Sequence, residues 1–465
     1  MNLRERISRI LSLKMTFIFL LGWVFAFLSM LVLPVSFISN VKQTLLKRVN
    51  LTSERALFSS SIDTSRYSFQ LIDNSTLSGT YQLAESDTKV IFAVDRFNGQ
   101  LYSFEYNGGI YEKNYLGNAF EALNIGQAPI NAKSGQKIDN AGNRVDKTSA
   151  IAPTVFDIEF AFGKLYMSVT LPGINNCTFL KLISFDPAKV SNNSSISKKV
   201  IFESPCITDK DNPTMWAGRI SHSNDSIFLS VGEQRYDPSG FPKNDSLSKL
   251  EIANPISVFG KVLQFSPRAD DFEIFSSGHR NAQGLYFSKD TSKLFESEHG
   301  PFGGDEVNIL DRGRDYGWPF RTYGKPYPLF ETGDSSDEIR SVNPASGIDK
   351  KLALFGAKSG THQGFFPPLM SWIPGVGAAN IYQVQSSTPF TDWHGNILVA
   401  HMKEGSLHRL VLNGDSAVLD ERINLGVRVR DFILTQSGFL VISTDDGHSS
   451  KGDLLFYEYS GLFDK

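Results

Sequence analysis

The sequence has little net charge, few cysteines and, after residue 60, no convincing long amphipathic helix. A net charge of −3 over 465 residues argues against a nucleic-acid-binding protein, because such proteins neutralise phosphates with an excess of lysine and arginine. The lack of helical periodicity, together with 36 Phe, 38 Gly and 20 Pro, indicates aromatic strands separated by turns. The sequence therefore predicts an all-β fold.

Only two cysteines are present, Cys177 and Cys206. Each borders a run of strand-like residues, at 179–185 and at 199–202. Two cysteines that flank neighbouring strands can close one disulfide if the domain is exported to an oxidising compartment. The alternative is a pair of unpaired thiols in loops. We expect the disulfide.

One long hydrophobic run is present, and it lies near the N-terminus. Residues 15–38 are almost wholly apolar, enough to span roughly 30 Å of bilayer hydrocarbon. No clean small-x-small cleavage site is visible, so we expect an uncleaved anchor rather than a cleaved signal peptide. The prediction is a cytoplasmic tail at 1–14, a single-pass transmembrane anchor at 15–38, a stalk at 39–60 and a folded domain at 61–465. That domain is expected on the extracytoplasmic side, either periplasmic or extracellular.

A strand–turn–strand pattern recurs along the folded domain. It is clearest at 219–233, 284–300 and 431–447, with a weaker copy at 155–171, and each copy ends in small or acidic residues. Self-similar all-β units at a period of about 65 residues indicate a propeller, in which each unit is one four-stranded blade. The length of the domain gives about six blades. The alternative is a two-domain β-sandwich, and the polar stretch 117–149 is expected to be a surface loop.

The segment 278–319 has the densest concentration of functional residue types. It begins with Arg280 and Asn281 and continues through Gly300-Pro301 to the acidic pair Asp305-Glu306. Such a run combines groups that hold anions, backbone oxygens that can coordinate a cation, and carboxylates. Function usually lies on loops that rigid strands position, so this segment is the expected centre of the site.

Five segments follow one another in the order in which a known family has them. They are GRISHSNDSIFLSVGE (218–233), GHRNAQGL (278–285), EHGPFGGDEVNIL with the later YGWP (298–310 and 316–319), HMKEGSLHRLVLNGD (401–415) and RVRDFILTQSGFLVISTDDG (428–447). Together they resemble the glucose/sorbosone dehydrogenases, soluble quinoprotein sugar dehydrogenases that use pyrroloquinoline quinone (PQQ) and calcium. The resemblance covers roughly 155–447 and implies a six-bladed β-propeller.

The resemblance implies a PQQ-binding set made of Arg280, Asn281, Lys403, Arg428 and Arg430. PQQ is a planar tricarboxylate, and the arginine fork is suited to carboxylates. Arg428 and Arg430 are two residues apart on a strand-like run, so both are expected to point to one face. A lone arginine or lysine is usually a solvated surface charge, but five polar residues at family positions favour a quinone site.

The resemblance also implies two calcium sites. The backbone carbonyls of Gly300 and Pro301 would hold the calcium that contacts the quinone, and Glu306 and Tyr316 match positions for a second, structural calcium. Calcium takes carboxylate and backbone oxygens. The alternative for Asp305-Glu306 is a solvated strand start. His299 is interpreted as a wall of the pocket.

One expected group is missing. In the family a catalytic histidine lies four residues before the arginine of the Gly218-Arg219-Ile220 strand, and here that position is Met215. Methionine cannot act as a base. Glu233 occupies the place of the acidic residue that assists the base, so it is the candidate base.

Two further observations concern this proton-transfer half of the site. The family's Gly-rich GEGG segment has no counterpart before Val155. His222 lies three residues after Arg219, on the opposite face of the same strand, and is interpreted as structural.

Two functions remain open. The first is a membrane-anchored quinoprotein oxidoreductase that oxidises a sugar or polyol hydroxyl by hydride transfer to PQQ, with calcium as Lewis acid. Its electrons would pass to an acceptor that no motif specifies. The second is a propeller that binds a ligand or partner and has lost turnover, because Met215 replaces the family histidine. We prefer the enzyme.

Overall fold

The structure is a computed structural model that describes residues 61–64, 67–107, 110–125, 135–138, 144–147, 153–174, 177–190, 195–208, 215–233, 255–267, 271–301, 303–318, 321–324, 362–446 and 451–462. The chain divides into two units, Met1–Leu57 and Phe58–Lys465, and all described residues belong to the second. The predicted tail, anchor and stalk lie outside the described residues. Within the described ranges, no helix is long and apolar enough to cross a membrane.

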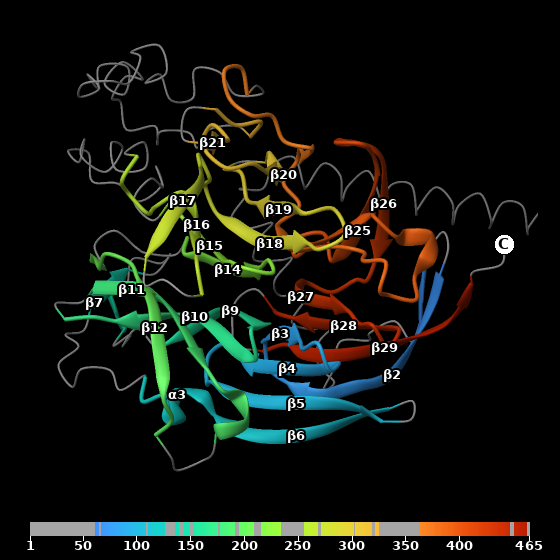
Figure 1. Cartoon of the computed structure of the whole chain (residues 1–465), viewed down its shortest axis with the longest axis horizontal. Coiled ribbons are helices and arrows are strands. Elements are labelled where there is room, and N and C mark those ends of the chain that lie inside the picture. The colour runs from blue at the N-terminus through green and yellow to red at the C-terminus, as the bar shows by residue number, and fades with distance from the viewer. Residues whose placement is uncertain are drawn as a thin grey trace, which may run out of the picture. The chain divides into compact units, whose positions relative to one another are not determined.

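Six sheets of four or five strands make up most of the described chain (Figure 1), and all their strand pairs are antiparallel except the parallel pair of β17 with β21. We number them blades 1 to 6 by the order of their first strands. Blade 1 consists of β3 (Tyr81–Glu85), β4 (Val90–Asp95), β5 (Gln100–Asn107) and β6 (Ile110–Asn118), and blade 2 of β9 (Thr154–Ala161), β10 (Lys164–Pro172), β11 (Cys177–Phe185) and β12 (Lys198–Glu203), with β13 (Ile207–Thr208). Blade 3 consists of β14 (Ala217–His222), β15 (Ile227–Val231), β16 (Lys261–Phe265) and β17 (Phe272–Ser277), with β21 (Arg314–Asp315), and blade 4 of β18 (Ala282–Ser288), β19 (Lys293–Glu298), β20 (Asp305–Leu310) and β22 (Met370–Trp372). Blade 5 consists of β23 (Ala378–Gln383), β24 (Ile397–His401), β25 (Ser406–Asn413) and β26 (Ser416–Asn424), and blade 6 of β27 (Val429–Leu434), β28 (Phe439–Thr444) and β29 (Asp453–Leu462), with β2 (Tyr67–Ser78) and β1 (Ser61–Asp63).

The first strands of the six blades form a closed ring. Strand β3 packs against β9 and β27, β14 packs against β9 and β18, and β23 packs against β18 and β27. A closed ring of six blades is the architecture of a propeller. The predicted all-β, six-bladed propeller is therefore confirmed, and the two-domain sandwich is excluded.

Blade 6 combines the two ends of the folded domain. Its inner strands β27, β28 and β29 come from the C-terminal part, while β2 and β1 come from the N-terminal part and complete the sheet. The ring of Tyr67 on β2 packs edge-on against Phe390, Trp393 and Tyr459. The ring of blades is thus closed by backbone hydrogen bonds and aromatic contacts between residues far apart in the chain.

The four repeated segments of the sequence form the two inner strands of four blades. They correspond to β9–β10, β14–β15, β18–β19 and β27–β28. In five blades the register of this hairpin shifts near the start of the first strand. Such bulges redirect a side chain, and the positions they displace include Arg219, Gln283, Asn380 and Arg430.

Arg219, on β14, joins several blades through a buried polar network. Its guanidinium pairs with Asp157 of blade 2 (Nε to Oδ2, 3.3 Å) and Asp431 of blade 6 (Nη2 to Oδ1, 3.2 Å). It also donates to Gln82 of blade 1 at 2.7 Å. Asn380 of blade 5 donates to Asp431 at 2.5 Å. Arg219, Asp157, Asp431 and Gln82 are each no more than 5% exposed, so these charges interact in a region of low dielectric.

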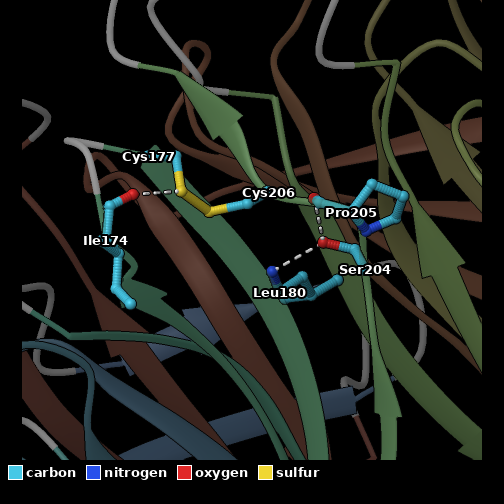
Figure 2. The surroundings of a disulfide bond; sticks show 6 residues. All are labelled: Ile174, Cys177, Leu180, Ser204, Pro205 and Cys206. Atoms are coloured by element: carbon cyan, nitrogen blue, oxygen red, sulfur yellow. Dashed lines mark hydrogen bonds between the residues drawn. A yellow bond between two sulfur atoms is a disulfide. The ribbon is translucent and has the colours of Figure 1, made fainter.

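The predicted disulfide is present between Cys177 and Cys206, whose Cα atoms lie 5.5 Å apart (Figure 2). A Cβ at Gly173 would lie 2.7 and 2.8 Å from the two sulfur atoms, so only glycine fits there. Next to the bond, the hydroxyl of Ser204 accepts a hydrogen bond from the backbone N–H of Leu180 at 2.9 Å. The disulfide thus fastens the outer part of blade 2, and the alternative of two unpaired thiols is wrong.

The expectation of a loop at 117–149 is only partly correct. The stretch includes the short helix α3 (Ala119–Ala122) and the hairpin of β7 (Gly135–Ile138) with β8 (Arg144–Lys147). The side chain of Asn118 caps the helix by accepting from the backbone N–H groups of Phe120 and Glu121, and the ring of Phe120 lies directly over Gly99. A four-residue helix is too short to show helical periodicity in the sequence. Its only sequence signals are the N-cap residue Asn118 and the buried ring of Phe120.

Arg219→Ala tests the buried network. The variant would leave Asp157 and Asp431 as uncompensated buried charges, so we expect the free energy of unfolding to fall by about 3–5 kcal/mol. Denaturant titration followed by circular dichroism measures the change. Arg312→Ala is the matched control, because Arg312 pairs with Glu273 at the exposed surface and should cost less than about 1 kcal/mol. Equal losses for both variants would contradict the assigned role.

Candidate active site

The predicted site residues share one structural position in successive blades. In blades 3 to 6 the first residue of the first strand faces the last residue of the second strand: the pairs are Ala217 with Val231, Ala282 with Glu298, Ala378 with His401 and Val429 with Thr444. The residues just before each first strand and just after each second strand therefore line one end of the ring. We call these flanking positions the rim. Arg280, Asn281 and Arg428 precede first strands, whereas Glu233, His299, Gly300 and Lys403 follow second strands.

Arg280 lies at the centre of the blade 4 rim and is 3% exposed. Its Nη1 donates to the carbonyl oxygens of His299 at 3.0 Å and Gly300 at 3.1 Å. Its Nε lies 3.9 Å from a carboxylate oxygen of Glu233, and its guanidinium lies 5.4 Å from the ring of Trp318. The guanidinium of Arg280 thus links the end of blade 3 to the end of blade 4.

Arg428 and Arg430 converge on a single carboxylate in blade 6. Arg428 Nε donates to Asp445 Oδ1 at 2.8 Å, and Arg430 Nε donates to Asp445 Oδ2 at 2.7 Å. The two side chains therefore point the same way, as the sequence predicted. Asp445, which was not among the predicted site residues, neutralises only one of the two charges, so the pair keeps a net positive charge.

A chain of hydrogen bonds connects blade 6 to blade 4. Arg430 Nη1 donates to Gln283 Oε1 at 3.4 Å, and Gln283 Nε2 donates to Asn281 Oδ1 at 2.9 Å. Asn281 is the neighbour of Arg280. The structure thus brings together Arg280, Asn281 and Arg430, which lie up to 150 residues apart in sequence.

Two further cations lie on the rim. Lys403 follows the second strand of blade 5, and its side chain is exposed. Arg428 Nη1 reaches the carbonyl of the preceding residue, Met402, at 3.5 Å, which places Lys403 next to the Arg428 side of the site. Arg96, which follows the second strand of blade 1, was not predicted. Burial and the nearby charge of Arg430 lower the pKa of Arg96 to about 9.

His299 is a partly buried histidine on the wall of a cavity, as predicted. The described residues that line this cavity are Arg280, Glu298, His299, Gly300, Gly304, Glu306, Tyr316, Trp318, Arg321, Thr322 and His362. The ring of His299 hydrogen bonds to the backbone of Ala378. Its Nε2 is buried and has no hydrogen-bond partner among the described residues, so Nδ1 is the donor and Nε2 is a bare acceptor. Burial lowers its pKa, which keeps the ring neutral.

Glu233 and Met215 are neighbours, but the described residues that line the cavity include neither of them. A Cβ at Gly232 would lie 1.8 Å from the Met215 carbonyl oxygen, so the two segments are in close contact. Glu233 is fully buried. Its backbone N–H donates to the Arg280 carbonyl at 2.9 Å, and its carboxylate faces the guanidinium of Arg280.

The Gly300-Pro301 loop is held in place by the carboxylate of Asp305. The N–H of Gly300 donates to Asp305 Oδ1 at 3.0 Å, and a Cβ at Gly300 would lie 2.2 Å from the Gly303 carbonyl oxygen. Asp305 Oδ2 accepts from the backbone of Val376 at 2.9 Å, so Asp305 is a loop organiser rather than a solvated residue. The Gly300 carbonyl faces Arg280, and a calcium ion bound there would have to share this oxygen with the guanidinium.

A cluster of buried carboxylates adjoins the cavity, and two of its members, Glu298 and Glu306, line it. Glu298 pairs across the sheet with Glu306, and Glu296 pairs with Asn308; all four are no more than 5% exposed. Burial and mutual repulsion raise the pKa values of Glu296 and Glu306 well above their usual range, and burial raises that of Glu298 to about 7. Within the described chain, Glu296 Oε1 and Asn308 Oδ1 have no hydrogen-bond partner.

These oxygens form a donor set that suits a calcium ion, since calcium prefers carboxylate and amide oxygens. The imidazole of His279 lies beside them, with Nδ1 3.6 Å from Glu296 Oε1. Glu306, one of the two predicted ligands, belongs to this cluster. The other predicted ligand, Tyr316, lies beside the cluster: its ring stacks on His279 at 5.1 Å, and its hydroxyl donates to the Ile309 carbonyl at 2.6 Å. The Tyr316 hydroxyl therefore has a structural partner.

Several residues of the cavity wall were not predicted. His362 lies 3.5 Å from Glu306 (Nε2 to Oε2), and burial lowers its pKa to about 4. Arg321 and Thr322 follow the YGWP motif and reach the same cavity. His362 comes from the long stretch after Thr322, where the sequence has no repeat to align. Glu298, Gly304 and Trp318 also line the cavity and lie within the family motifs, so the sequence signal could have identified them.

Comparison with known proteins places this geometry in a family. Residues 163–455 match the model of the family described as Glucose / Sorbosone dehydrogenase, which covers more than half of the chain. Aldose sugar dehydrogenase YliI of Escherichia coli K12 is 32% identical over 246 residues, covering 49% of this chain and 56% of that protein. Quinoprotein glucose dehydrogenase B of Acinetobacter calcoaceticus is 28% identical over 213 residues, covering 39% of this chain and 44% of that protein. This chain thus spans about half the length of these relatives.

Solved structures share the fold along almost their whole length. The apo form of the soluble aldose sugar dehydrogenase of Escherichia coli has a TM-score of 0.57 and 20% identity, with 84% of this chain and 99% of that chain covered. The PQQ-bound form of an aldose sugar dehydrogenase of Streptomyces coelicolor has a TM-score of 0.52 and 18% identity, with 85% and 99% covered. At this identity the likeness concerns the fold.

The buried carboxylates predict an unusual pH dependence of the metal-free protein. Glu298 loses its proton at its ordinary pKa near 4.5 when unfolded, and only near 7 when folded. The folded state therefore binds more protons between these values, so the free energy of unfolding falls as pH rises through the window, by about 3 kcal/mol for this group. Calcium should reverse the loss, raising the melting temperature more at pH 8 than at pH 5.

Thermal unfolding at both pH values, with chelator or with calcium, measures this effect. Glu298→Gln should weaken the pH dependence and the stabilisation by calcium. Glu203→Gln is the control, because that residue forms an exposed ion pair with Lys181. A metal-free protein that becomes more stable from pH 5 to pH 8 would contradict the interpretation of this cluster.

Proposed function

Because the chain belongs to the glucose/sorbosone dehydrogenase family, we propose that it is a PQQ-dependent oxidoreductase that oxidises a hydroxyl group of a sugar or polyol. One observation supports this most directly: Arg280, Arg428 and Arg430 converge on one rim next to the neutral imidazole of His299. Three arginines held in place can bind a planar polycarboxylate. A neutral imidazole with an unprotonated nitrogen can accept a proton from the substrate.

PQQ would be held by Arg280, Asn281, Lys403, Arg428 and Arg430. When bound, it supplies a two-electron acceptor for the hydride of the substrate. Arg428 and Arg430 are held in place by Asp445, so they need little rearrangement to bind an anion. Arg280 would bind a carboxylate of PQQ, either in addition to the carbonyls of His299 and Gly300 or in place of one of them. The carbonyls of Gly300 and Pro301 would hold a calcium ion beside the cofactor, and Glu306 would belong to the second calcium site.

His299 is the residue we propose as proton acceptor in place of the absent family histidine. His299 lines the cavity, its Nε2 has no hydrogen-bond partner among the described residues, and its ring is held by a hydrogen bond to the backbone of Ala378. Glu233, the sequence-based candidate, is fully buried and faces Arg280. Its negative charge would instead hold the guanidinium of Arg280 in place, which makes it a positioning residue.

We further propose that the propeller lies outside the cytoplasm, anchored by residues 15–38. The Cys177–Cys206 disulfide supports an oxidising compartment, and the apolar run is long enough to span a bilayer. Electrons from the cofactor would then pass to a membrane-bound or soluble acceptor.

Reconstitution of the full chain with PQQ and calcium tests the proposed function. Absorbance of bound PQQ should bleach on addition of an aldose, and an artificial acceptor should sustain turnover. Arg430→Gln should weaken PQQ binding by 10-fold or more, since charge-assisted hydrogen bonds contribute about 1.5–3 kcal/mol. Arg312→Gln, at the exposed surface, should not change it. PQQ that binds and is never reduced by any sugar or polyol would instead support the propeller without turnover.

A second experiment separates His299 from Met215 and Glu233. His299→Ala should lower kcat by about 100-fold or more, the usual contribution of a general base, while PQQ still binds; added imidazole should restore part of the rate. Met215→His should leave the rate of a working enzyme nearly unchanged. If His299→Ala is fully active and Met215→His gains activity, the base belongs to the Met215 position and our assignment is wrong.

A further inference from the structure

The turn after β24 contains a cluster of metal-binding side chains outside the PQQ and calcium residues. We propose that His401, Glu404 and His408 form a binding site for a divalent transition-metal ion of the zinc class. The proposal goes beyond the oxidoreductase function and does not depend on it. Its basis is the geometry of one hairpin in blade 5.

The hairpin places both histidines on one face of the sheet. His401 is the last residue of β24 and pairs with Ser406, while His408 pairs with Val399. Since side chains alternate along a strand, Ser406 and His408 share a face, and His408 is the diagonal neighbour of His401. The two imidazole rings lie 4.0 Å apart between centroids.

Glu404 completes the set from the tight turn. Gly405, with φ of 65°, lies in the turn that reverses the chain and brings the Glu404 carboxylate close to a nitrogen of each ring. Glu404 Oε2 lies 3.1 Å from His408 Nε2 and 3.8 Å from His401 Nδ1. One ligand atom from each of the three residues lies within 4.8 Å of the others. Around a tetrahedral ion with bonds of about 2.1 Å, ligand atoms are about 3.4 Å apart, so only small adjustments are required.

The supporting contacts are those of a metal-bound histidine. His408 Nδ1 hydrogen bonds to Asp420 Oδ1 at 2.6 Å, so its Nε2 is directed to Glu404, whose Oε2 it contacts in a hydrogen bond of 3.1 Å that a metal ion would replace. Asp420 Oδ2 in turn accepts from Trp372 Nε1 at 3.0 Å. A carboxylate that fixes the other ring nitrogen of a metal-binding histidine is typical of such sites and strengthens the ligand.

His401 gives the second, independent indication. Its side chain is fully buried, yet neither ring nitrogen has a hydrogen-bond partner among the described residues. A buried polar group without a partner is rare and calls for a ligand or a functional role. Its Nδ1 faces Glu404, so a metal ion between them would satisfy it.

The donor set selects the metal. Two imidazoles and one carboxylate suit zinc and related transition metals, whereas calcium prefers oxygen ligands alone. Three protein ligands also leave one coordination position open. The Glu404 side chain is 30% exposed, and the exposed Arg422 lies 3.6 Å from it, so an ion can reach the site from solvent once Arg422 moves aside.

Titration with cobalt tests the proposal, using the full chain purified without a polyhistidine tag and stripped with chelator. We expect one Co²⁺ per chain with visible absorption bands of a tetrahedral or five-coordinate site, displaced by Zn²⁺ and unaffected by Ca²⁺. His408→Gln and Glu404→Gln should weaken Co²⁺ binding by at least 100-fold. Asp420→Asn, which keeps all three ligands, should weaken it by about 10–100-fold.

His222→Gln is the matched control, because His222 also hydrogen bonds to a carboxylate, Glu159, at 2.6 Å, but belongs to none of the three-residue groups found among the described residues. It should bind Co²⁺ like the unaltered chain. Circular dichroism checks that each variant is folded. Absence of the absorption bands, or equal Co²⁺ affinity in His408→Gln and the unaltered chain, would overturn the proposal and leave a hydrogen-bonded histidine network. Neither result depends on PQQ or on sugar oxidation.

Discussion

The propeller depends on the buried charge of Arg219. This single guanidinium, on the first strand of blade 3, binds Asp157 of blade 2, Asp431 of blade 6 and Gln82 of blade 1. Asp431 also accepts from the backbone N–H of Leu83 at 2.9 Å. Hydrophobic packing holds neighbouring blades together without direction, whereas these bonds fix the angles at which the inner strands meet. The inner ring is therefore rigid at the point where the site begins.

The same inner strands orient the site. Arg430 is the residue before Asp431, and the bulge at the start of β27 lies between Val429 and Asp431. The bulge lets Asp431 point into the network around Arg219 while Arg430 reaches Asp445 and Gln283. One irregular step in one strand thus connects the structural network to the cationic rim. A change in Arg219 should therefore disturb the orientation of Arg430 as well as the stability of the fold.

The sequence revealed the architecture where blades keep short turns. The hairpins β14–β15, β18–β19 and β27–β28 have compact polar turns, and their repetition identified the propeller. The inner hairpin of blade 5 was missed because a longer connection, with the 3₁₀ turn Thr391–Trp393, interrupts its pattern. The closure of blade 6 by β2 was also missed, since strand pairing between residues some 380 positions apart leaves no local signal. Partners such as Asp445 and His362 could not be found because only the fold places them beside Arg430 and Glu306.

The ends of the second strands explain why side chains of different chemical types lie close together at one end of the ring of blades. Each blade offers the same position, after the second strand, to the same rim, and each fills it differently. The last residue of the second strand is Val231, Glu298, His401 and Thr444 in blades 3 to 6. Within the next two residues come Glu233, His299, Lys403 and Asp445, respectively. Because the backbone hydrogen bonds across these ends are alike in each blade, as between His299 N and Asn281 O or Asp445 N and Arg428 O, side chains can change without moving the strand. Oxygen donors in blade 4 and imidazoles in blade 5 can therefore select different cations on one scaffold.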